Sequence, residues 1–372
     1  MSLAATPDIE AGLYIGLMSG TSMDGVDAVL AEFSAPVPKL IATHYLPYPQ
    51  GLAERLLALQ IPAENELHIA ARLGIEVTRL YDQAIKALLG KTGADAAAIQ
   101  AIGCHGQTVR HNPGEGYTLQ LCNPALLAEL SGIGVVADFR SRDIAAGGEG
   151  APLVPAFHEA VFRSPAKHRV ILNVGGIANV TDLNPRSATT GFDTGPGNVL
   201  LDAWTRLHTG QAFDADGAWA AAGQVNPRLL DALLGHPYLA LTPPKSCGRE
   251  QFNLGWLESR LNADITAVDV QATLLEFTAG SVAAAIRRWC GVPDELVVCG
   301  GGAHNKTLLE RLGTHLPQTR VFASDSLGID ADWVEAAAFA WLARQTLLGL
   351  PGNLPAVTGC KGARVLGAIY PR

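Results

Sequence analysis

Short apolar runs separated by glycine-rich turns dominate the hydrophobic pattern of this chain, and they predict buried strands. In its first part a meander of strands precedes a long helix, after which strand and helix alternate. The strands are predicted at residues 13–17, 26–33, 39–45, 99–104 and 134–137, and the helices at 64–89 and 124–130. The longer helix is predicted because apolar residues recur at helical spacing between Leu67 and Leu88. This order predicts one α/β lobe.

The same order of elements appears again after residue 170. Strands are predicted at 170–174, 180–183, 190–193 and 296–299, and helices at 198–208, 267–289, 306–312 and 334–347. The repetition predicts a duplicated unit of three strands plus helices, and therefore two lobes, although sequence similarity between the halves is too weak to establish it. We expect the first lobe at residues 1–147 together with 356–372, and the second lobe at 148–355. The tail is expected to return to the first lobe.

Composition narrows the function classes. The 372 residues are 48% hydrophobic and 17% charged, as in a globular enzyme, and the net charge is −8 without a Lys/Arg cluster. We therefore expect no nucleic-acid partner. No apolar run is long enough to span a membrane, and the first residues lack a secretory signal pattern. Six cysteines without a CxxC pair argue against zinc and fit a reduced, cytoplasmic setting.

Four of the strand-like runs end in glycine-rich turns, within residues 13–27, 170–180, 190–200 and 296–305. Such turns expose backbone N–H groups that bind anions, above all phosphate. The first turn, residues 20–27, lacks the lysine of a Walker A loop, and a strand rather than a helix follows it. Its hydroxyls, N–H groups and two carboxylates suit β- and γ-phosphates and a water-bound Mg²⁺. An ordinary polar hairpin is the alternative.

Two further turns lie between a strand and a helix. Residues 193–198 place a helix N-terminus where it can face an anion. Asn198 is equally suited to serve as the N-cap, since both roles use the same donors. The three glycines at 300–302 leave room for a flat ligand, such as an adenine ring, against the backbone. A loop that only needs close packing is the alternative for these glycines.

Several polar side chains are candidates for chemistry on a substrate. Asp182 ends a hairpin strand a few residues after a glycine turn, which suits a general base, although aspartate is also common at strand ends. The sequence His105-Gly-Gln-Thr follows a strand, where ligands gather in α/β sheets. Alternating charge in residues 138–149 suits sugar hydroxyls or a carboxylate, or forms a solvated interdomain loop. Glu335 lies three residues after Asp332, the spacing of a helix capping box, which is the preferred interpretation. A ligand contact is the alternative for Glu335.

These motifs resemble the anhydro-N-acetylmuramic acid kinases, a family within the actin/Hsp70/sugar-kinase superfamily. The resemblance covers essentially the whole chain and rests on GLYIGLMSGTSMDGVD, CHGQT, ADFRSRDIAAGGEGAPL, NVGGIAN, FDTGPGN, CGGGAHN and DADWVEAAA. It implies a two-lobed α/β fold of the actin-like ATPase type, with duplicated ribonuclease-H-like domains around a central cleft. It also implies ATP and Mg²⁺ as cofactors, a cytoplasmic role in peptidoglycan recycling, and small-molecule partners only, with a homodimer as one alternative for the assembly.

The reaction implied by the resemblance opens the anhydro bridge of 1,6-anhydro-N-acetylmuramic acid with water and phosphorylates O6, giving N-acetylmuramic acid 6-phosphate and ADP. An ordinary sugar kinase without ring opening and a sugar-independent ATPase are the alternatives. By this resemblance Asp182 is the base, and the metal candidates are Asp24 and Asp193, because the first loop has no aspartate before its first glycine.

The remaining expected site residues fall into two groups. The nucleotide group comes from the glycine turns and comprises Gly20, Thr21, Ser22, Met23, Asp24, Gly25, Val26, Asp27, Gly175, Gly176, Asn179, Gly195, Gly197, Asn198, Gly300, Gly301 and Gly302. The sugar group comprises His105, Gln107, Thr108, Asp138, Arg142 and Glu335.

Overall fold

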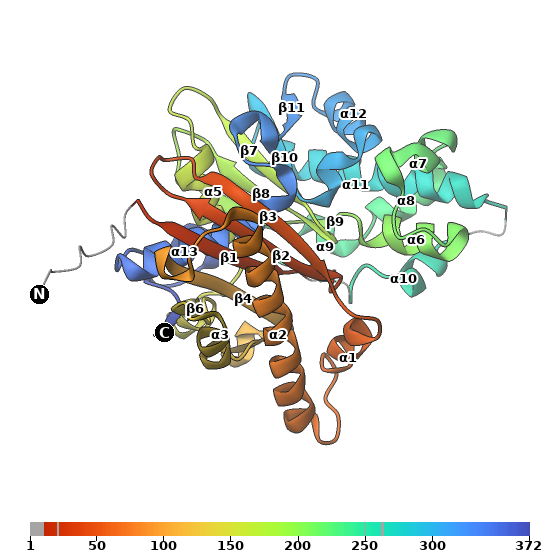
Figure 1. Cartoon of the computed structure of the whole chain (residues 1–372). Helices are drawn as coiled ribbons and strands as arrows, with labels where there is room; N and C mark the ends of the chain where they lie inside the picture. The colour runs from red at the N-terminus through yellow and green to blue at the C-terminus, as the bar shows by residue number, and fades with distance from the viewer. Residues whose placement is uncertain (1–10, 21, 249, 262–263) are drawn as a thin grey trace, which may run out of the picture. The chain divides into compact units, whose positions relative to one another are not determined.

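The computed structural model describes residues 11–20, 22–248, 250–261 and 264–372 (Figure 1). The chain forms two compact units, each with its own sheet. The first unit runs to Val161 and resumes at Trp333–Arg372, and the second unit is Phe162–Asp332. The predicted α/β class is therefore confirmed.

The sheet of the first unit has the order β12-β6-β4-β1-β2-β3, and β5 also pairs with β4. Its strands are β1 (Leu13–Ser19), β2 (Gly25–Glu32), β3 (Lys39–Pro47), β4 (Ile99–Asn112), β5 (Tyr117–Leu121), β6 (Val135–Ala137) and β12 (Ala368–Tyr370). β12 pairs antiparallel with β6, so the tail returns to the first sheet as predicted.

The sheet of the second unit has the order β11-β10-β7-β8-β9. Its strands are β7 (Arg169–Val174), β8 (Ile177–Leu183), β9 (Thr190–Pro196), β10 (Glu295–Cys299) and β11 (Arg320–Ala323). β7, β8 and β9 form an antiparallel meander, and β7, β10 and β11 are parallel. The first unit repeats this pattern, with β1, β2 and β3 as the meander and β1, β4 and β6 parallel. The shared strand order and direction confirm the predicted duplication.

Helices cover both sheets (Figure 1). Those of the first unit are α1 (Leu52–Ala58), α2 (Glu66–Thr92), α3 (Pro124–Ser131), α4 (Ser141–Ala145), α5 (Val154–Phe162), α13 (Val334–Leu347) and α14 (Pro355–Thr358). Those of the second unit are α6 (Val199–Thr209), α7 (Ala218–Ala222), α8 (Pro227–Leu234), α9 (Pro237–Ala240), α10 (Leu254–Glu258), α11 (Ala267–Trp289) and α12 (Lys306–His315).

The long helices α2 and α13 pack on opposite faces of the first sheet. Ile15 and Leu17 of β1 lie in the apolar cluster that includes the buried face of α2. Gly16, between them, faces α13 instead, because successive strand residues point to opposite faces. A Cβ on Gly16 would lie 1.8 Å from the carbonyl oxygen of Ala336, and one on Gly103 2.0 Å from that of Phe339. These two glycines let the helix backbone touch the sheet.

This contact corrects the expected lobe boundaries. Residues 148–161 and the whole of α13 were expected in the second lobe, but they belong to the first unit. α13 belongs to the first unit because it packs on β1 and β4, two strands that lie far from it in the sequence. The helix α13 itself has the predicted bounds, as does α11.

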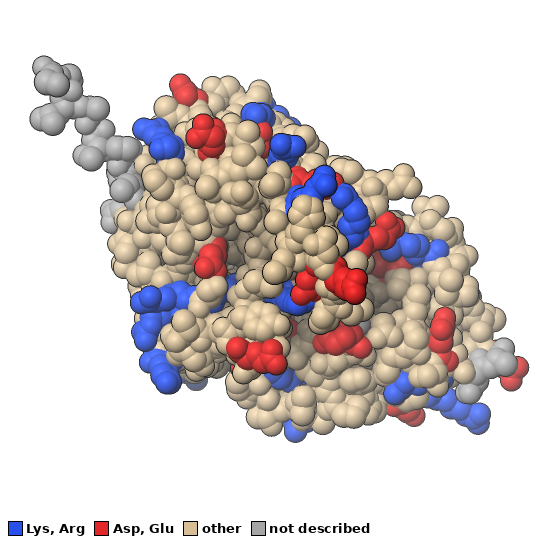
Figure 2. All heavy atoms as spheres, turned by 90° about the horizontal axis from the view of Figure 1, so that it is seen from below, with Lys and Arg blue, Asp and Glu red and all other residues tan. Residues whose placement is uncertain are grey.

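Charged side chains of both signs are mixed on the surface. Figure 2 shows basic and acidic side chains on the same face, separated by neutral residues. Among the described residues, no helix combines the length and the apolar character needed to cross a membrane.

Candidate active site

The first glycine turn forms the tip of the β1–β2 hairpin. Ser22 is exposed, and its hydroxyl donates a hydrogen bond to Asp24 Oδ1 at 2.7 Å. The backbone N–H of Met23 donates to the carbonyl of Gly20 at 3.3 Å, and Met23 has a positive φ of 54°. Thr21 lies outside the described residues. The tip therefore presents a hydroxyl and a carboxylate beside the turn.

Three predicted residues of this hairpin do not present side chains to a ligand. Met23 is 2% exposed and Val26 is fully buried, and both belong to the core cluster under the sheet. Gly25 is buried at the start of β2, where a Cβ would lie 2.5 Å from the ring of Tyr45. Asp27 is half-buried on β2. The side chains of Met23 and Val26 point inward, so only their backbone groups could face a nucleotide, and their expected place in the nucleotide group stays a prediction.

Gln107 is also placed differently from the expectation. It is fully buried, and its Oε1 accepts a hydrogen bond from the Tyr48 hydroxyl at 2.9 Å. Its Nε2 donates to the carbonyl of Gly20 at 3.1 Å. Both ends of the amide are thus used within the protein, and Gln107 fixes the hairpin. Tyr48 was missed because 59 residues separate it from Gln107.

His105 and Glu335 meet at a third residue, Arg140. His105 is 5% exposed, and its Nε2 accepts hydrogen bonds from Arg140 Nε at 3.1 Å and Nη2 at 2.8 Å. Burial, together with the Arg140 charge, holds the pKa of His105 well below its usual value, so the imidazole is neutral. Burial lowers the pKa of Arg140 to about 10, while Glu335 and Asp143 favour its charged form. The structure therefore joins three segments in one polar cluster.

The loop after β6 is organised by a buried carboxylate, Asp143. Its Oδ2 accepts from the Gly150 N–H at 2.8 Å, and its Oδ1 accepts from the Thr358 hydroxyl at 2.8 Å and from Asn353 Nδ2 at 2.5 Å. Arg140 Nη1 donates to the carbonyl of Gly150 at 2.8 Å. This network gives a structural role to Asp143 and Arg140, two of the five charged side chains in residues 138–149.

The other predicted sugar contacts lie nearer the surface. Asp138 is exposed, with φ 58°, and accepts a hydrogen bond from Ser141 at 2.5 Å. Arg142 is exposed on α4. Thr108 is half-buried, and its hydroxyl accepts from Gln120 Nε2 at 3.2 Å.

The expected capping box at the start of α13 is not formed. Asp332 Oδ1 accepts a hydrogen bond from His304 Nε2 at 2.8 Å, and this bond raises the pKa of His304. The residue at the N-cap position is Trp333, which makes no side-chain cap. Glu335 instead acts electrostatically on Arg140 and favours its charged form.

In the second unit, three glycine turns pack against one another. The Gly197 N–H donates to the carbonyl of Gly176 at 2.9 Å, and the Asn198 N–H donates to that of Gly175 at 2.8 Å. A Cβ on Gly197 would lie 2.3 Å from the Gly175 oxygen, and one on Gly302 2.4 Å from the Val174 side chain. Close packing thus requires these glycines whether or not a ligand is present.

The side chain of Asn198 links two of these turns instead of capping α6. It makes no side-chain cap on α6, and its Nδ2 donates to the carbonyl of Val174 at 3.1 Å. Asn173, which is not among the predicted site residues, lies beside Gly300. Asn173 is 6% exposed, its Oδ1 has no partner among the described residues, and this oxygen is 2.4 Å from where a Gly300 Cβ would be. A buried, unpartnered carbonyl oxygen is a candidate for a ligand hydrogen bond.

Asp182 lies at the other end of β8 from the glycine turn. Its register partner is Val170, near the start of β7, whereas the turn follows Val174. Five extended steps separate Asp182 from Ile177, which is roughly 17 Å. Asp182 Oδ1 accepts from His168 Nε2 at 2.6 Å and from the Asn184 N–H at 3.1 Å. The expectation that Asp182 lies near the glycine turn is wrong, because successive residues of a strand carry it away from that turn.

Asp193 lies at the end of the sheet where the turns are. Pairing places Cys299, Asn173, Asn179 and Asp193 in one row across β10, β7, β8 and β9. This row is at the carboxyl ends of the parallel strands β7 and β10, where ligands bind in α/β sheets. Asp193 Oδ2 accepts from the Cys247 N–H at 3.1 Å, and no donor of the described residues bonds its Oδ1.

Burial raises the pKa of Asp193 to about 6, against the opposing effects of the Cys247 N–H and the Lys245 charge. A carboxylate with a raised pKa and one uncommitted oxygen is suited to accept a proton near neutral pH. Among the described residues, no group of three or more His, Cys, Asp or Glu side chains is arranged to hold a metal ion.

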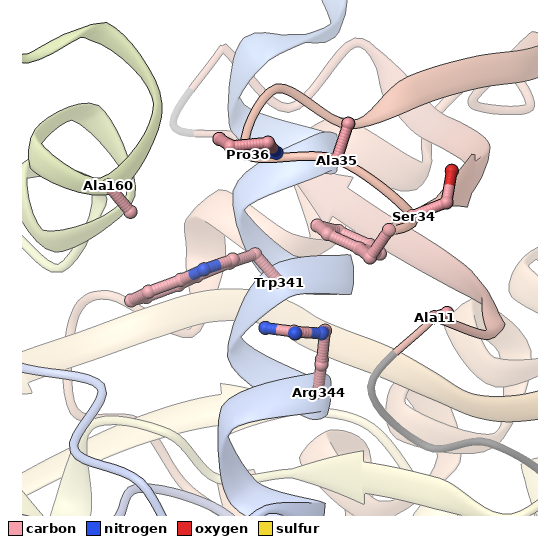
Figure 3. Close-up of a pocket in the computed structure, with 8 residues that line it drawn as sticks. Ala11, Ser34, Ala35, Pro36, Ala160, Trp341 and Arg344 are labelled. Atoms are coloured by element: carbon pink, nitrogen blue, oxygen red, sulfur yellow. The ribbon is translucent and has the colours of Figure 1, made fainter.

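A surface hollow of about 420 Å³ lies elsewhere in the first unit (Figure 3). Trp341 and Arg344 project into it from α13, opposite Ala160 and the loop of residues 34–36. Ala11, which precedes β1, also lines it. The hollow therefore lies at the opposite end of the β1–β2 hairpin from Gly20 and is separate from the first glycine turn.

Comparison with known proteins gives matches over nearly the whole chain. A family model described as anhydro-N-acetylmuramic acid kinase matches residues 12–372. A protein of that name from Nitrosospira multiformis is 57% identical over 365 residues, which cover 98% of this chain and 100% of that protein. A protein of the same name from Thiobacillus denitrificans is 58% identical over 373 residues, which cover 99% of this chain and 100% of that protein. Among solved structures, a ROK family glucokinase from Streptomyces griseus has 15% identity and a TM-score of 0.44, covering 90% of this chain and 100% of that one.

Proposed function

Because the chain belongs to the anhydro-N-acetylmuramic acid kinase family, we propose that it opens 1,6-anhydro-N-acetylmuramic acid with water and phosphorylates O6 at the expense of ATP, with Asp193 as the base. The observation that supports the choice of base is the position of Asp193 in the row at the carboxyl ends of β7 and β10. Peptidoglycan recycling in the cytoplasm is part of the same proposal.

The chemistry needs one carboxylate. Water attacks the anomeric carbon C1, the C1–O6 bond breaks, and O6 takes the γ-phosphoryl group in place of a proton. The bond between the γ-phosphorus and the β–γ bridging oxygen breaks, so ADP leaves. The base accepts the proton of the attacking water. An inverting glycosidase uses a second carboxyl group to protonate the leaving oxygen, and here the phosphoryl group replaces that acid.

Asp193 suits this role better than Asp182. Asp182 lies at the opposite end of β8 from the glycine turn, and its Oδ1 already accepts two hydrogen bonds, one of them from His168. Asp193 has one backbone donor on Oδ2, and its pKa of about 6 leaves it ionised at neutral pH yet basic enough to take a proton. The proposal therefore moves the base from Asp182 to Asp193, and Asp193 is no longer a metal candidate.

The glycine turns are proposed to hold the nucleotide. In the second unit, the turn before α6 places backbone N–H groups of a helix N-terminus where they can face phosphate, and Gly300–Gly302 leave room for the base. The tip of the β1–β2 hairpin, with Ser22 and the backbone of Gly20, supplies further donors. Donors aimed at the phosphoryl group offset the charge that develops during transfer.

Asp24 fits a Mg²⁺ that keeps most of its waters. Its carboxylate is exposed and bonded only by the Ser22 hydroxyl among the described residues. Mg²⁺ in kinases uses one or two carboxylates together with phosphate oxygens, so a large cluster of protein ligands is not needed. When bound, the ion neutralises phosphate charge, and Asp24 is the residue that would hold it through water.

The cluster of His105, Arg140 and Glu335 is proposed to bind the sugar, with Thr108, Asp138 and Arg142 as further contacts. Arg140 supplies positive charge for the lactyl carboxylate, and the neutral His105 fixes the orientation of its guanidinium.

Release of ADP in a coupled assay tests the proposed reaction. With 1,6-anhydro-N-acetylmuramic acid we expect turnover, and with N-acetylmuramic acid, glucose or N-acetylglucosamine we expect rates lower by at least roughly 10²-fold, because these sugars lack the anhydro bridge. Comparable transfer to the open sugars would favour an ordinary sugar kinase. ATP hydrolysis indifferent to any sugar would favour a sugar-independent ATPase.

A further inference from the structure

Asp193 is enclosed by a short segment of the second unit, residues 237–247, which we call the strap. β9 is the edge strand of its sheet, so the outward backbone groups of Asp193 have no neighbouring strand to pair with. The strap supplies the partners. The Asp193 N–H donates to the carbonyl of Lys245 at 3.1 Å, and its own carbonyl accepts from the Tyr238 hydroxyl at 2.7 Å. With the Cys247 N–H on Oδ2, three strap residues hold one aspartate.

The strap is closed on itself by Lys245. Its Nζ donates to the carbonyls of Tyr238 and Leu239 at 3.2 and 3.3 Å and lies 4.6 Å from the centre of the Tyr238 ring. Leu239 packs on β9, where a Cβ on Gly195 would lie 3.1 Å from its Cδ2. The Tyr238 ring meets Phe252 edge to face. The loop that carries the donors is therefore fixed at both ends.

We infer that Tyr238 and Lys245 are positioning residues for the base, holding the Asp193 carboxylate in place through the strap. This inference rests on the proposed role of Asp193. A general base must keep its carboxylate oxygen within hydrogen-bond reach of the attacking water, and small displacements of such a group lower the rate strongly.

Lys245 also sets the charge around the base. The titratable groups that face Asp193 are Tyr238, Lys245 and Cys247, all from the strap. Arg288 in turn faces Lys245, and Glu250 faces Cys247. Burial raises the pKa of the Cys247 thiol to about 12, so it stays neutral, and Lys245 is the cation that lowers the pKa of Asp193. Removal of that cation should therefore raise the pKa of Asp193 further.

The pH dependence of kcat/KM of the full chain tests this inference. Because the base must be ionised, activity is lost as the pH falls through its pKa. In Lys245→Met we expect this acid limb to move to higher pH by roughly one unit, and in Lys245→Arg to stay near the wild-type position. In Tyr238→Phe, which keeps the ring, we expect kcat to fall by roughly tenfold with the KM for ATP unchanged. Lys306→Met, which removes an exposed lysine paired with Asp216, is the matched control and should leave the limb in place.

Activity of Asp193→Asn separates failure of the positioning role from failure of the base assignment. If Asp193→Asn is inactive but the acid limbs of Lys245→Met and wild type coincide and Tyr238→Phe keeps the wild-type kcat, the positioning role is overturned and the base assignment stands. If Asp193→Asn retains activity, the base assignment itself fails. Thermal melting of each variant shows whether it is folded, and the limb position is a readout that loss of folded protein alone does not move.

Discussion

Replacing Asp193 by asparagine is expected to lower turnover of 1,6-anhydro-N-acetylmuramic acid by roughly 10²- to 10⁴-fold. The amide keeps the shape of the side chain but cannot accept the proton of the attacking water. Because the backbone N–H groups proposed to hold phosphate are unchanged, the affinity for ATP should stay within about threefold of wild type. Steady-state ADP release measures the first quantity, and calorimetric titration with a non-hydrolysable ATP analogue measures the second.

Asp182→Asn is the matched control for this prediction. It makes the same chemical change on the neighbouring strand, at the other end of the sheet. We expect kcat within about threefold of wild type but a lower melting temperature, because the buried partner His168 loses its carboxylate. An inactive Asp182→Asn beside an active Asp193→Asn would reverse the assignment.

Gly16→Ala is expected to destabilise the first unit. The new methyl group would overlap the Ala336 carbonyl oxygen at 1.8 Å and approach the Ala340 nitrogen at 2.8 Å, so α13 must move away from the sheet. Overpacking of this kind costs typically about 1–3 kcal/mol, and we expect a value near the upper end because backbone rather than side chain is displaced. Urea unfolding followed by circular dichroism measures the free energy of unfolding.

Gly90→Ala is the control for Gly16→Ala. Gly90 lies in α2, is exposed, and has no described atom within 4 Å of an added Cβ. Alanine there should stabilise the helix by roughly 0.5–1 kcal/mol. A Gly16→Ala protein as stable as wild type would show that α13 does not depend on close backbone contact with β1.

Much of the fold follows from local patterns. The periodicity of α11 and α13 depends on neighbouring residues, so their bounds were predictable, and the order of strands and helices revealed the duplication. The C-terminal end of α2 was less predictable. The helix was predicted to end at residue 89, but it continues to Thr92 and is capped by Gly93, whose φ of 68° is left-handed.

The site was harder to predict because its geometry depends on register and on distant contacts. Asp182 and Asp193 both lie a few residues from a glycine turn in the sequence, and only strand pairing separates the two ends of the sheet. Gln107 follows a strand as a ligand contact would, yet Tyr48 and Gly20 use its amide. Arg140 joins His105 and Glu335 across the fold, and no local pattern indicates that meeting.

The central claim is that water attacks C1 while O6 receives the phosphoryl group. The most direct test is one reaction in water labelled with heavy oxygen, stopped early and analysed by mass spectrometry of the sugar phosphate and its fragments. The account predicts the label at C1 of N-acetylmuramic acid 6-phosphate and none in the phosphate, beyond the exchange seen when unlabelled product is incubated in the same water. Label in the transferred phosphate, or product without label at C1, would contradict it.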